Sequence, residues 1–402
     1  MMNKRIIGAL LVALAFFGGR ALAAQNVANT SQQGSLLIWP LISVDPEDST
    51  DTFVEISNDG IGTVHVECEY INEQKGRVNF DFFLTAKQTL SWEALTGSGG
   101  TDINGGTPIA TPAFPYGGDY PSLSPTIGPL DDRIGELVCF AVDTGRANQV
   151  VWNHLTGNAT VANFYDGDAY VPTQAFRYNA WAFAARGNSG PSTADGTVIP
   201  GPGKLLLTGG GWGTYDACPL YNTANFMPNG SYLGPQYNVL YTLDNDLAVS
   251  ICNQDLRQDF NLHITKLQFT TWNELENSFT GAYVCADSTD DEGLSYSDNS
   301  YLVDSGNFDF GTLGTPNARF QVQGVASTQC FVTIPNPANP STNIIINSEN
   351  TGLLGVLTSS IGLNYSSEDQ EIGSTTQGAG TEAGYVLWDP NAGGPPPVRP
   401  KH

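Results

Sequence analysis

The sequence is short of charged residues, and of basic residues in particular. Only 14% of its 402 residues are charged, and 16 Lys and Arg stand against 40 Asp and Glu. The formal net charge of −24 argues against nucleic-acid binding, which needs a basic face, and against docking to anionic lipid. A hydrophobic content of 40% still allows a sizeable core, so global disorder is not expected.

The common catalytic motifs are missing as well. The cysteines form no C-x-x-C pair, and the four histidines are too far apart for an i, i+4 metal pair. His65 alternates outward in an expected strand, so we interpret it as a solvated surface residue. Ser189 in GNSGP resembles a protease nucleophile loop only faintly, because it lies in a predicted linker without a partnered histidine. We assign no catalytic residue.

The chain begins with the features of an export signal. Lys4 and Arg5 precede an apolar stretch at residues 6–17, and residues 21–23 (ALA) supply a small-x-small cleavage site. An uncleaved membrane anchor is the alternative, but the apolar run is short for a bilayer span. We therefore predict a signal peptide at residues 1–23 and an exported protein, periplasmic or extracellular, with no membrane span after cleavage.

Six cysteines in an oxidising compartment predict structural disulfides, with buried free thiols as the alternative. Cys68 shares a strand face with Val64 and Val66, which favours an inter-sheet bond to Cys139. By analogy Cys252 would pair with Cys330, which leaves Cys218 for Cys285. The second pairing is weaker, because Cys252 is out of phase with its inward-facing neighbours. Six cysteines allow about 15 connectivities, of which this is one.

Two segments of the chain match each other without a gap. Residues 80–95 and 260–275 share five identities: Phe80/Phe260, Thr85/Thr265, Gln88/Gln268, Trp92/Trp272 and Leu95/Leu275. Weaker matches join residues 34–38 to 203–207, residues 53–58 with 64–68 to 239–252, and residues 137–140 to 328–331. These matches predict an internal duplication; likeness by composition alone is the alternative.

The fold class follows from the turns and the strand pattern. The chain has 45 Gly and 24 Pro, alternating apolar stretches and no long helical pattern, which is typical of an all-β protein. We expect two tandem antiparallel Ig-like β-sandwich modules related by internal duplication. The predicted parts are the signal peptide, module 1 at 34–186, a Gly/Pro-rich linker at 187–203, module 2 at 204–390 and a Pro-rich tail at 391–402. Long loops are expected at 97–129 and 276–316.

Two groups of residues are candidates for ligand binding. Aromatic residues crowd one region and could form a sugar-stacking platform, although core packing is their commoner use: Trp152, Tyr165, Tyr170, Tyr178 and Trp181. An acidic cluster could hold calcium in an irregular site, although a solvated acidic loop is the simpler interpretation: Asp287, Asp290, Asp291 and Glu292. The EF-hand pattern fails there, because its first acid and its last Glu are absent.

Much of the first half resembles a known kind of protein. The start GSLLIWP, the strand FVEISN and the segment at residues 139–185 are similar to a loose group of exported bacterial β-sandwich proteins of unassigned function. The resemblance covers mainly residues 34–185. It implies an extracytoplasmic bacterial setting and a non-enzymatic protein, and it supplies no catalytic residues.

These observations lead to three hypotheses about function. The first is an exported non-enzymatic structural or adhesive β-sandwich protein of the cell envelope or extracellular space, whose partner is a protein or a glycan at the cell surface. The second is a carbohydrate-binding protein that uses aromatic residues and calcium. The third is a secreted hydrolase with an unrecognised acidic site, for which 40 acidic residues single out no carboxylate pair.

Overall fold

The computed structural model describes most of the chain between residues 27 and 378. The described residues are 27–46, 50–72, 76–97, 99, 111–115, 133–164, 172–185, 197–198, 215–233, 240–252, 264–286, 289–294, 302–336, 339–365 and 368–378. The predicted signal peptide and tail, and most of the predicted linker, lie outside these ranges. Among the described residues no helix has the length and apolar character needed to cross a membrane.

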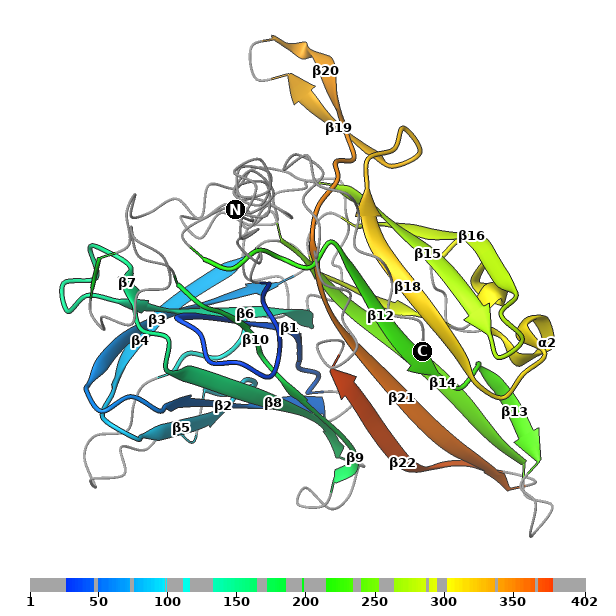
Figure 1. The fold of residues 1–402 in the computed structure, drawn as a ribbon, viewed down its shortest axis with the longest axis horizontal. Coiled ribbons are helices and arrows are strands. Elements are labelled where there is room, and N and C mark those ends of the chain that lie inside the picture. Colours follow the sequence, from blue (N-terminus) through cyan, green and yellow to red (C-terminus); the bar gives the residue numbers. More distant parts are fainter. Residues whose placement is uncertain are drawn as a thin grey trace, which may run out of the picture. The chain divides into compact units, whose positions relative to one another are not determined.

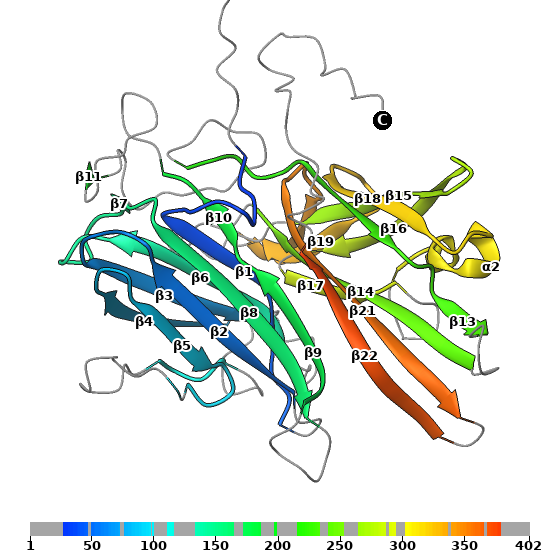
Figure 2. The same ribbon diagram turned by 60° about the horizontal axis from the view of Figure 1, so that its bottom comes forward.

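The first half forms two antiparallel sheets (Figures 1 and 2). One has the order β10 (Trp181–Phe183), β1 (Leu36–Ser43), β6 (Ile134–Val142), β3 (Val64–Asn72), β4 (Arg77–Leu84). The other has the order β5 (Thr89–Glu93), β2 (Thr50–Asn58), β8 (Leu155–Phe164), β9 (Pro172–Asn179). Both contribute to one buried cluster, because alternate residues of each strand point inward, as Val54 and Ile56 do on β2 and Phe80 and Phe82 do on β4.

The second half forms another two antiparallel sheets around its own cluster, which includes Phe269, Phe308 and Phe320. One has the order β12 (Tyr221–Phe226), β18 (Ala318–Val325), β15 (Thr265–Asn273), β16 (Ser278–Ala286). The other contains β13 (Gly230–Leu233), β14 (Leu240–Ile251), β21 (Leu353–Tyr365) and β22 (Glu368–Gly378), and β17 (Thr289–Gly293) also pairs with β14. The protein is therefore nearly all β, as the sequence predicts.

The remaining elements are short. They are β7 (Val150–Val151) paired with β11 (Thr197–Val198), the hairpin β19 (Phe331–Asn336) and β20 (Asn339–Asn347), the 3-10 helix η1 (Ser305–Phe308) and the helix α2 (Phe310–Leu313). Much of the stretch 276–316, which the sequence suggests is a structureless loop, is therefore β16, β17 and two helical turns. That expectation is wrong, because Ala282, Val284 and Ala286 alternate inward and make β16 a sandwich strand.

The strand order repeats between the two halves. The order β1–β6–β3–β4 recurs as β12–β18–β15–β16, and the order β5–β2–β8–β9 recurs as β17–β14–β21–β22. Each strand of the second series occupies the same place in chain order as its counterpart, with β13 and the β19–β20 hairpin added. The two halves therefore share the order and connection of their strands, whether or not the sequences of these strands match.

The sequence matches that predicted a duplication do not follow this repetition. Residues 85–93 form the turn after β4 and then β5, whereas the matching residues 265–273 form the single strand β15. Trp92 is buried and its match Trp272 is only half-buried. By strand order β15 is the counterpart of β3, so the gapless match pairs segments that do not correspond.

All six cysteines are paired. Cys68 bonds Cys139 as expected, but the bond joins neighbouring strands β3 and β6 of one sheet and does not bridge two sheets. The other two bonds, Cys218–Cys252 and Cys285–Cys330, differ from the expected pairing. The analogy fails because Cys252 lies beyond the end of β14, beside the segment that precedes β12.

Candidate functional site

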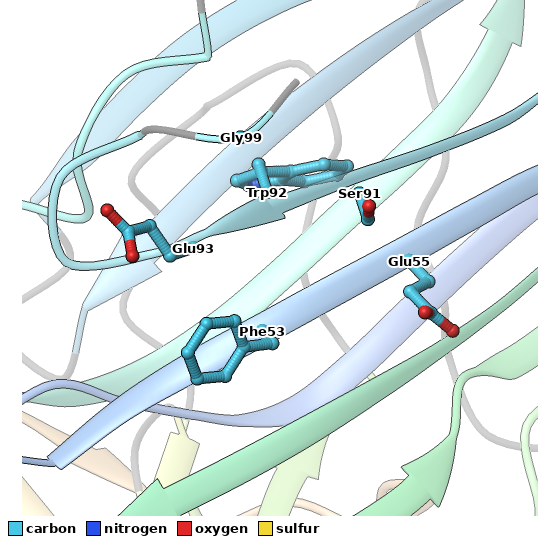
Figure 3. A pocket seen from close by; sticks show the side chains of 6 residues that line it. All are labelled: Phe53, Glu55, Ser91, Trp92, Glu93 and Gly99. Carbon is cyan, nitrogen blue, oxygen red and sulfur yellow. The ribbon is translucent and has the colours of Figure 1, made fainter. Parts of the chain in front are cut away.

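The outer face of β2 and β5 carries a solvent-open pocket of about 270 Å³ (Figure 3). Val54 and Ile56 point into the core, so the alternate residues Phe53 and Glu55 point outward. On β5, Ser91 and Glu93 point outward for the same reason, and the register places Phe53 opposite Glu93 and Glu55 opposite Ser91. An aromatic ring, two carboxyl groups and a hydroxyl therefore share one patch.

The same pattern continues across the sheet. Phe53 is opposite Thr160 on β8, and Thr160 is opposite Arg177 on β9. The guanidinium of Arg177 donates to the carboxylate of Glu55 at 2.8 Å between Nη2 and Oε2. The next row places Glu55 opposite Asn158, whose side-chain oxygen is buried and has no hydrogen-bond partner among the described residues. The outer face of this sheet thus carries an ion pair beside a buried amide oxygen.

Phe53 is the unusual member of this face. Its side chain is 38% exposed, although large apolar residues are most often buried. The ring of Phe164 meets it edge-on, with 6.1 Å between the ring centroids. This contact leaves Phe53 in place while part of its surface stays open, which suits stacking against a flat, partly apolar ligand.

A buried carboxyl group supports the edge of the pocket. Asp51 Oδ1 accepts the backbone N–H groups of Thr52 at 2.7 Å and Leu95 at 2.9 Å, which ties the end of β5 to β2. Burial raises the pKa of Asp51 to about 6, with the backbone hydrogen bonds opposing that rise. Gly99 completes the lining with φ +109°, a backbone conformation that favours glycine.

The aromatic residues proposed from the sequence lie elsewhere. Trp152 is buried and its Nε1 donates to Asn58 Oδ1 at 2.9 Å, while the hydroxyl of Tyr178 donates to the carbonyl of Leu41. Trp181 is completely buried, and its Nε1 donates to Gly355 O at 3.2 Å. These three face the core, so their assignment to a ligand platform is wrong. Tyr165 and Tyr170 lie outside the described residues.

His65 is also placed differently from expectation. Its ring is buried and stacks on Phe83 with 4.1 Å between centroids. Nε2 lies 2.8 Å from Asp81 Oδ2, and Nδ1 lies 3.3 Å from the carbonyl oxygen of Asp143. These neighbours cover the outward face of β3. The alternation correctly predicted that the His65 side chain points away from the core, but the prediction that this side chain is solvated is wrong. Both ring nitrogens are engaged, so the ring is not open to a substrate.

One buried acid with a raised pKa was not singled out by the sequence. Glu136 on β6 is buried on the outer face of its sheet with Glu69 and Arg77, which form an ion pair at 3.4 Å. Burial raises the pKa of Glu136 to about 7; Ser250 and Arg77 oppose that rise, and Glu69 adds to it. The site is closed to solvent, so we treat it as a structural cluster with a titratable member.

The proposed calcium ligands are only partly described. Asp290, Asp291 and Glu292 belong to β17, paired with β14 through Val249, Ala248 and Leu247, and Asp287 lies outside the described residues. Among the side chains that the structure describes, no group of three or more His, Cys, Asp or Glu could hold a metal ion. The calcium hypothesis therefore stays a prediction.

The β2–β5 pocket is the candidate functional site of this protein. The sequence alternation gives Phe53 the outward side of a strand whose inward side is apolar, but only the structure shows that this side stays open. No known protein family and no curated protein matches this chain.

Proposed function

We propose that this is an exported, non-enzymatic β-sandwich protein with an adhesive or structural role at the cell envelope or in the extracellular space. Three disulfides fit an oxidising compartment outside the cytoplasm. The repeated strand order supports two sandwich modules of common origin, with the first extending to about β10 and the second starting near β12. A net charge of −24 makes nucleic acid an unsuitable partner.

The ligand class that the β2–β5 face suits best is a glycan. The observation that carries this proposal is the exposed ring of Phe53, flanked by hydrogen-bonding groups on Glu93, Glu55 and Arg177. A sugar ring offers an apolar C–H face to stack on an aromatic ring and hydroxyl groups around its rim. Carboxylates, a guanidinium and amides are the groups that bind those hydroxyls.

The test is a glycan array followed by titration calorimetry on the best ligand. Phe53→Ala should weaken binding about tenfold or more, because it removes the stacking surface. Ile61→Ala is the matched control, because Ile61 is 91% exposed and lies in a turn away from the pocket. Its affinity should equal that of the unchanged protein.

Two further measurements separate the alternatives. Repeating the titration with a chelator tests the calcium hypothesis, because a calcium-dependent ligand would be released. Mass spectrometry of the glycan after long incubation should show it intact. Cleaved glycan, or equal binding by Phe53→Ala and the unchanged protein, would contradict the proposal.

A further inference from the structure

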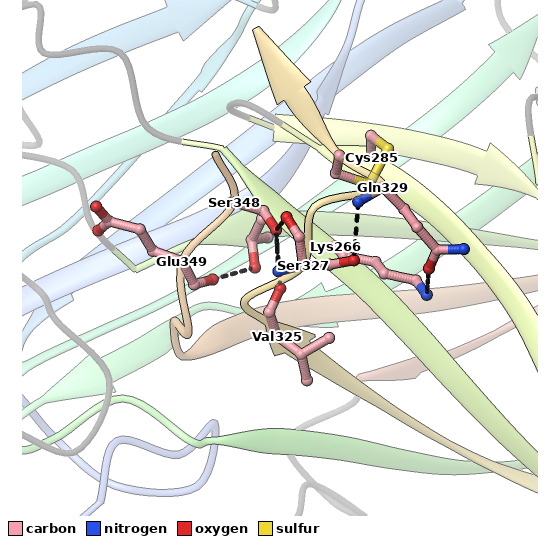
Figure 4. Close-up of a disulfide and its surroundings, with 9 residues drawn as sticks. Lys266, Cys285, Val325, Ser327, Gln329, Ser348 and Glu349 are labelled. Atoms are coloured by element: carbon pink, nitrogen blue, oxygen red, sulfur yellow. Dashed lines mark hydrogen bonds between the residues drawn. A yellow bond between two sulfur atoms is a disulfide. The ribbon is translucent and has the colours of Figure 1, made fainter. Parts of the chain in front are cut away.

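The β19–β20 hairpin is an arm whose base is fixed (Figures 1 and 4). Among the described residues its two strands pair only with each other. At the base, Cys330 is bonded to Cys285 of β16, and Lys266 Nζ donates to Gln329 Oε1 at 2.6 Å. The hydroxyl of Ser348 donates to Ser327 O at 2.9 Å. An isolated two-stranded hairpin is marginally stable in water, so such an arm needs this anchorage or further pairing.

The arm exposes apolar side chains on both of its faces. Phe331 is 52% exposed, Ile344 39% and Ile345 59%. Ile344 and Ile345 are consecutive, so they point to opposite faces of the ribbon. A ribbon that simply projected into solvent would have at least one polar face, and exposed apolar groups of this kind mark interaction surfaces.

The arm is also free of charge. No Asp, Glu, Lys or Arg occurs at residues 320–348, within a chain whose net charge is −24. Natural edge strands are usually protected against pairing by charged residues or proline. β20 has Pro340 near its start, but residues 341–347 (STNIIIN) contain neither, and their three consecutive isoleucines have strong β propensity, which is typical of a segment that pairs with another strand.

Alternate residues of β20 direct their backbone N–H and C=O groups away from β19. The N–H of Ser348 bonds to Cys330 O at 3.0 Å, so Ser348 and Cys330 form a hydrogen-bonded pair. Hydrogen-bonded and non-hydrogen-bonded pairs alternate along an antiparallel ladder. The next hydrogen-bonded pairs are therefore those that Ile346 and Ile344 form with β19. Asn343, Ile345 and Asn347 therefore direct their N–H and C=O groups to the outer edge.

The outer edge is complementary to itself. Residues 343–347 read Asn-Ile-Ile-Ile-Asn in both directions. About a two-fold axis at Ile345, an antiparallel second copy would place Asn343 opposite Asn347, Ile344 opposite Ile346 and Ile345 opposite Ile345. Self-complementarity of this kind is what a two-fold interface requires. The neutral arm is also a place where two chains of net charge −24 can meet without local repulsion.

We propose that two copies of this protein associate edge to edge through β20, forming a four-stranded sheet from two arms. This inference is independent of the proposed glycan face, because Phe53 and β20 belong to different sheets. The partner is a second copy, and the contact is made by main-chain hydrogen bonds centred on Ile345.

The test is sedimentation velocity of the purified, oxidised protein from about 1 to about 100 µM. A reversible dimer is expected. Ile345→Pro removes an N–H that only the second copy uses, so it should raise the dissociation constant at least about tenfold. Ile345→Lys should do the same by placing two like charges opposite each other.

Thr333→Pro is the matched control. Thr333 lies opposite Ile345, and its N–H faces the other edge of the arm, so this variant should still dimerise. Disulfide mapping of each variant checks that the arm has kept its anchor. A monomer across the whole concentration range, or a dimer that Ile345→Pro and Ile345→Lys leave unchanged, would overturn the proposal, as would equal loss in Thr333→Pro.

Discussion

Asn72 and Asn273 close the same turn in the two halves of the protein. Each stands at the end of its strand, β3 or β15, and accepts a hydrogen bond on Oδ1 from the backbone N–H four residues later, at 2.6 Å from Gly76 and 3.0 Å from Asn277. Each Nδ2 donates to a carbonyl of the segment before β6 or β18, at 2.8 Å to Pro115 and to Leu313. The correspondence of β3 with β15 thus extends to side-chain hydrogen bonds.

This relationship explains why the cysteines do not repeat. Cys68 precedes Asn72 by four residues and is opposite Cys139. Phe269 precedes Asn273 by four residues and is opposite Val322. Both members of the second pair are buried, so an apolar contact occupies the position of the disulfide. Pairing Cys252 with Cys330 by analogy therefore had no structural basis.

The two asparagines should contribute similarly to stability. Asn72→Ala and Asn273→Ala each leave a backbone donor and acceptor without their side-chain partner, so each should lower the free energy of unfolding by about 1–3 kcal/mol. Chemical denaturation measures the change. Asn317→Ala is the control, because Asn317 is exposed and should change stability by less than about 0.5 kcal/mol. A neutral Asn273→Ala beside a costly Asn72→Ala would contradict the correspondence.

Two tryptophans should respond unequally to the same substitution. Both Trp92 and Trp39 are buried, but Trp92 Nε1 donates to the hydroxyl of Tyr70 at 2.6 Å, whereas Trp39 Nε1 has no partner among the described residues. Trp92→Phe should therefore cost about 1–2 kcal/mol more than Trp39→Phe, because only the former breaks a buried hydrogen bond. Denaturant titrations of both variants give the difference. Equal losses would show that the bond contributes nothing net.

The three disulfide bonds can be identified experimentally in the purified protein. Peptide mapping without reduction should recover Cys68–Cys139, Cys218–Cys252 and Cys285–Cys330. Replacing both Cys285 and Cys330 with Ser should speed amide hydrogen exchange in β19 and β20, since the arm would lose its anchor, and should leave β3 and β6 unchanged. Recovery of a Cys252–Cys330 peptide would contradict the structure.

Glu136 should make stability depend on pH. Its pKa rises from an ordinary value of 4.5 to about 7 on folding, so the native chain binds more protons than the unfolded chain between these values. Stability therefore falls as the pH rises from about 4.5 through about 7. Relative to Glu136→Gln, the unchanged protein should lose up to about 3 kcal/mol over that range.

Urea titrations at several pH values measure this effect. Asp51, whose pKa is also raised, is present in both proteins and cancels from the difference. The control Glu349→Gln changes an exposed acid and should keep the slope of the unchanged protein. A Glu136→Gln slope equal to that of the unchanged protein would show that Glu136 stays ionised when folded.

By itself the sequence determined the all-β class, the inward side of strands such as β2 and β4, and the inward position of Cys68. These follow from a period of two, which is a local property of the chain. The same alternation placed His65 on an outward side; applied to residues 53–57, it gives the outward side to Phe53 as well.

Only the tertiary structure decided what covers each outward side. His65 is covered by Phe83 and Asp81, whereas Phe53 stays open, and nothing local distinguishes them. The correspondence of β3 with β15 and the partners of the last four cysteines likewise depend on how distant strands are ordered within a sheet. That order is set by long-range packing between segments far apart in the chain, which a local pattern does not encode.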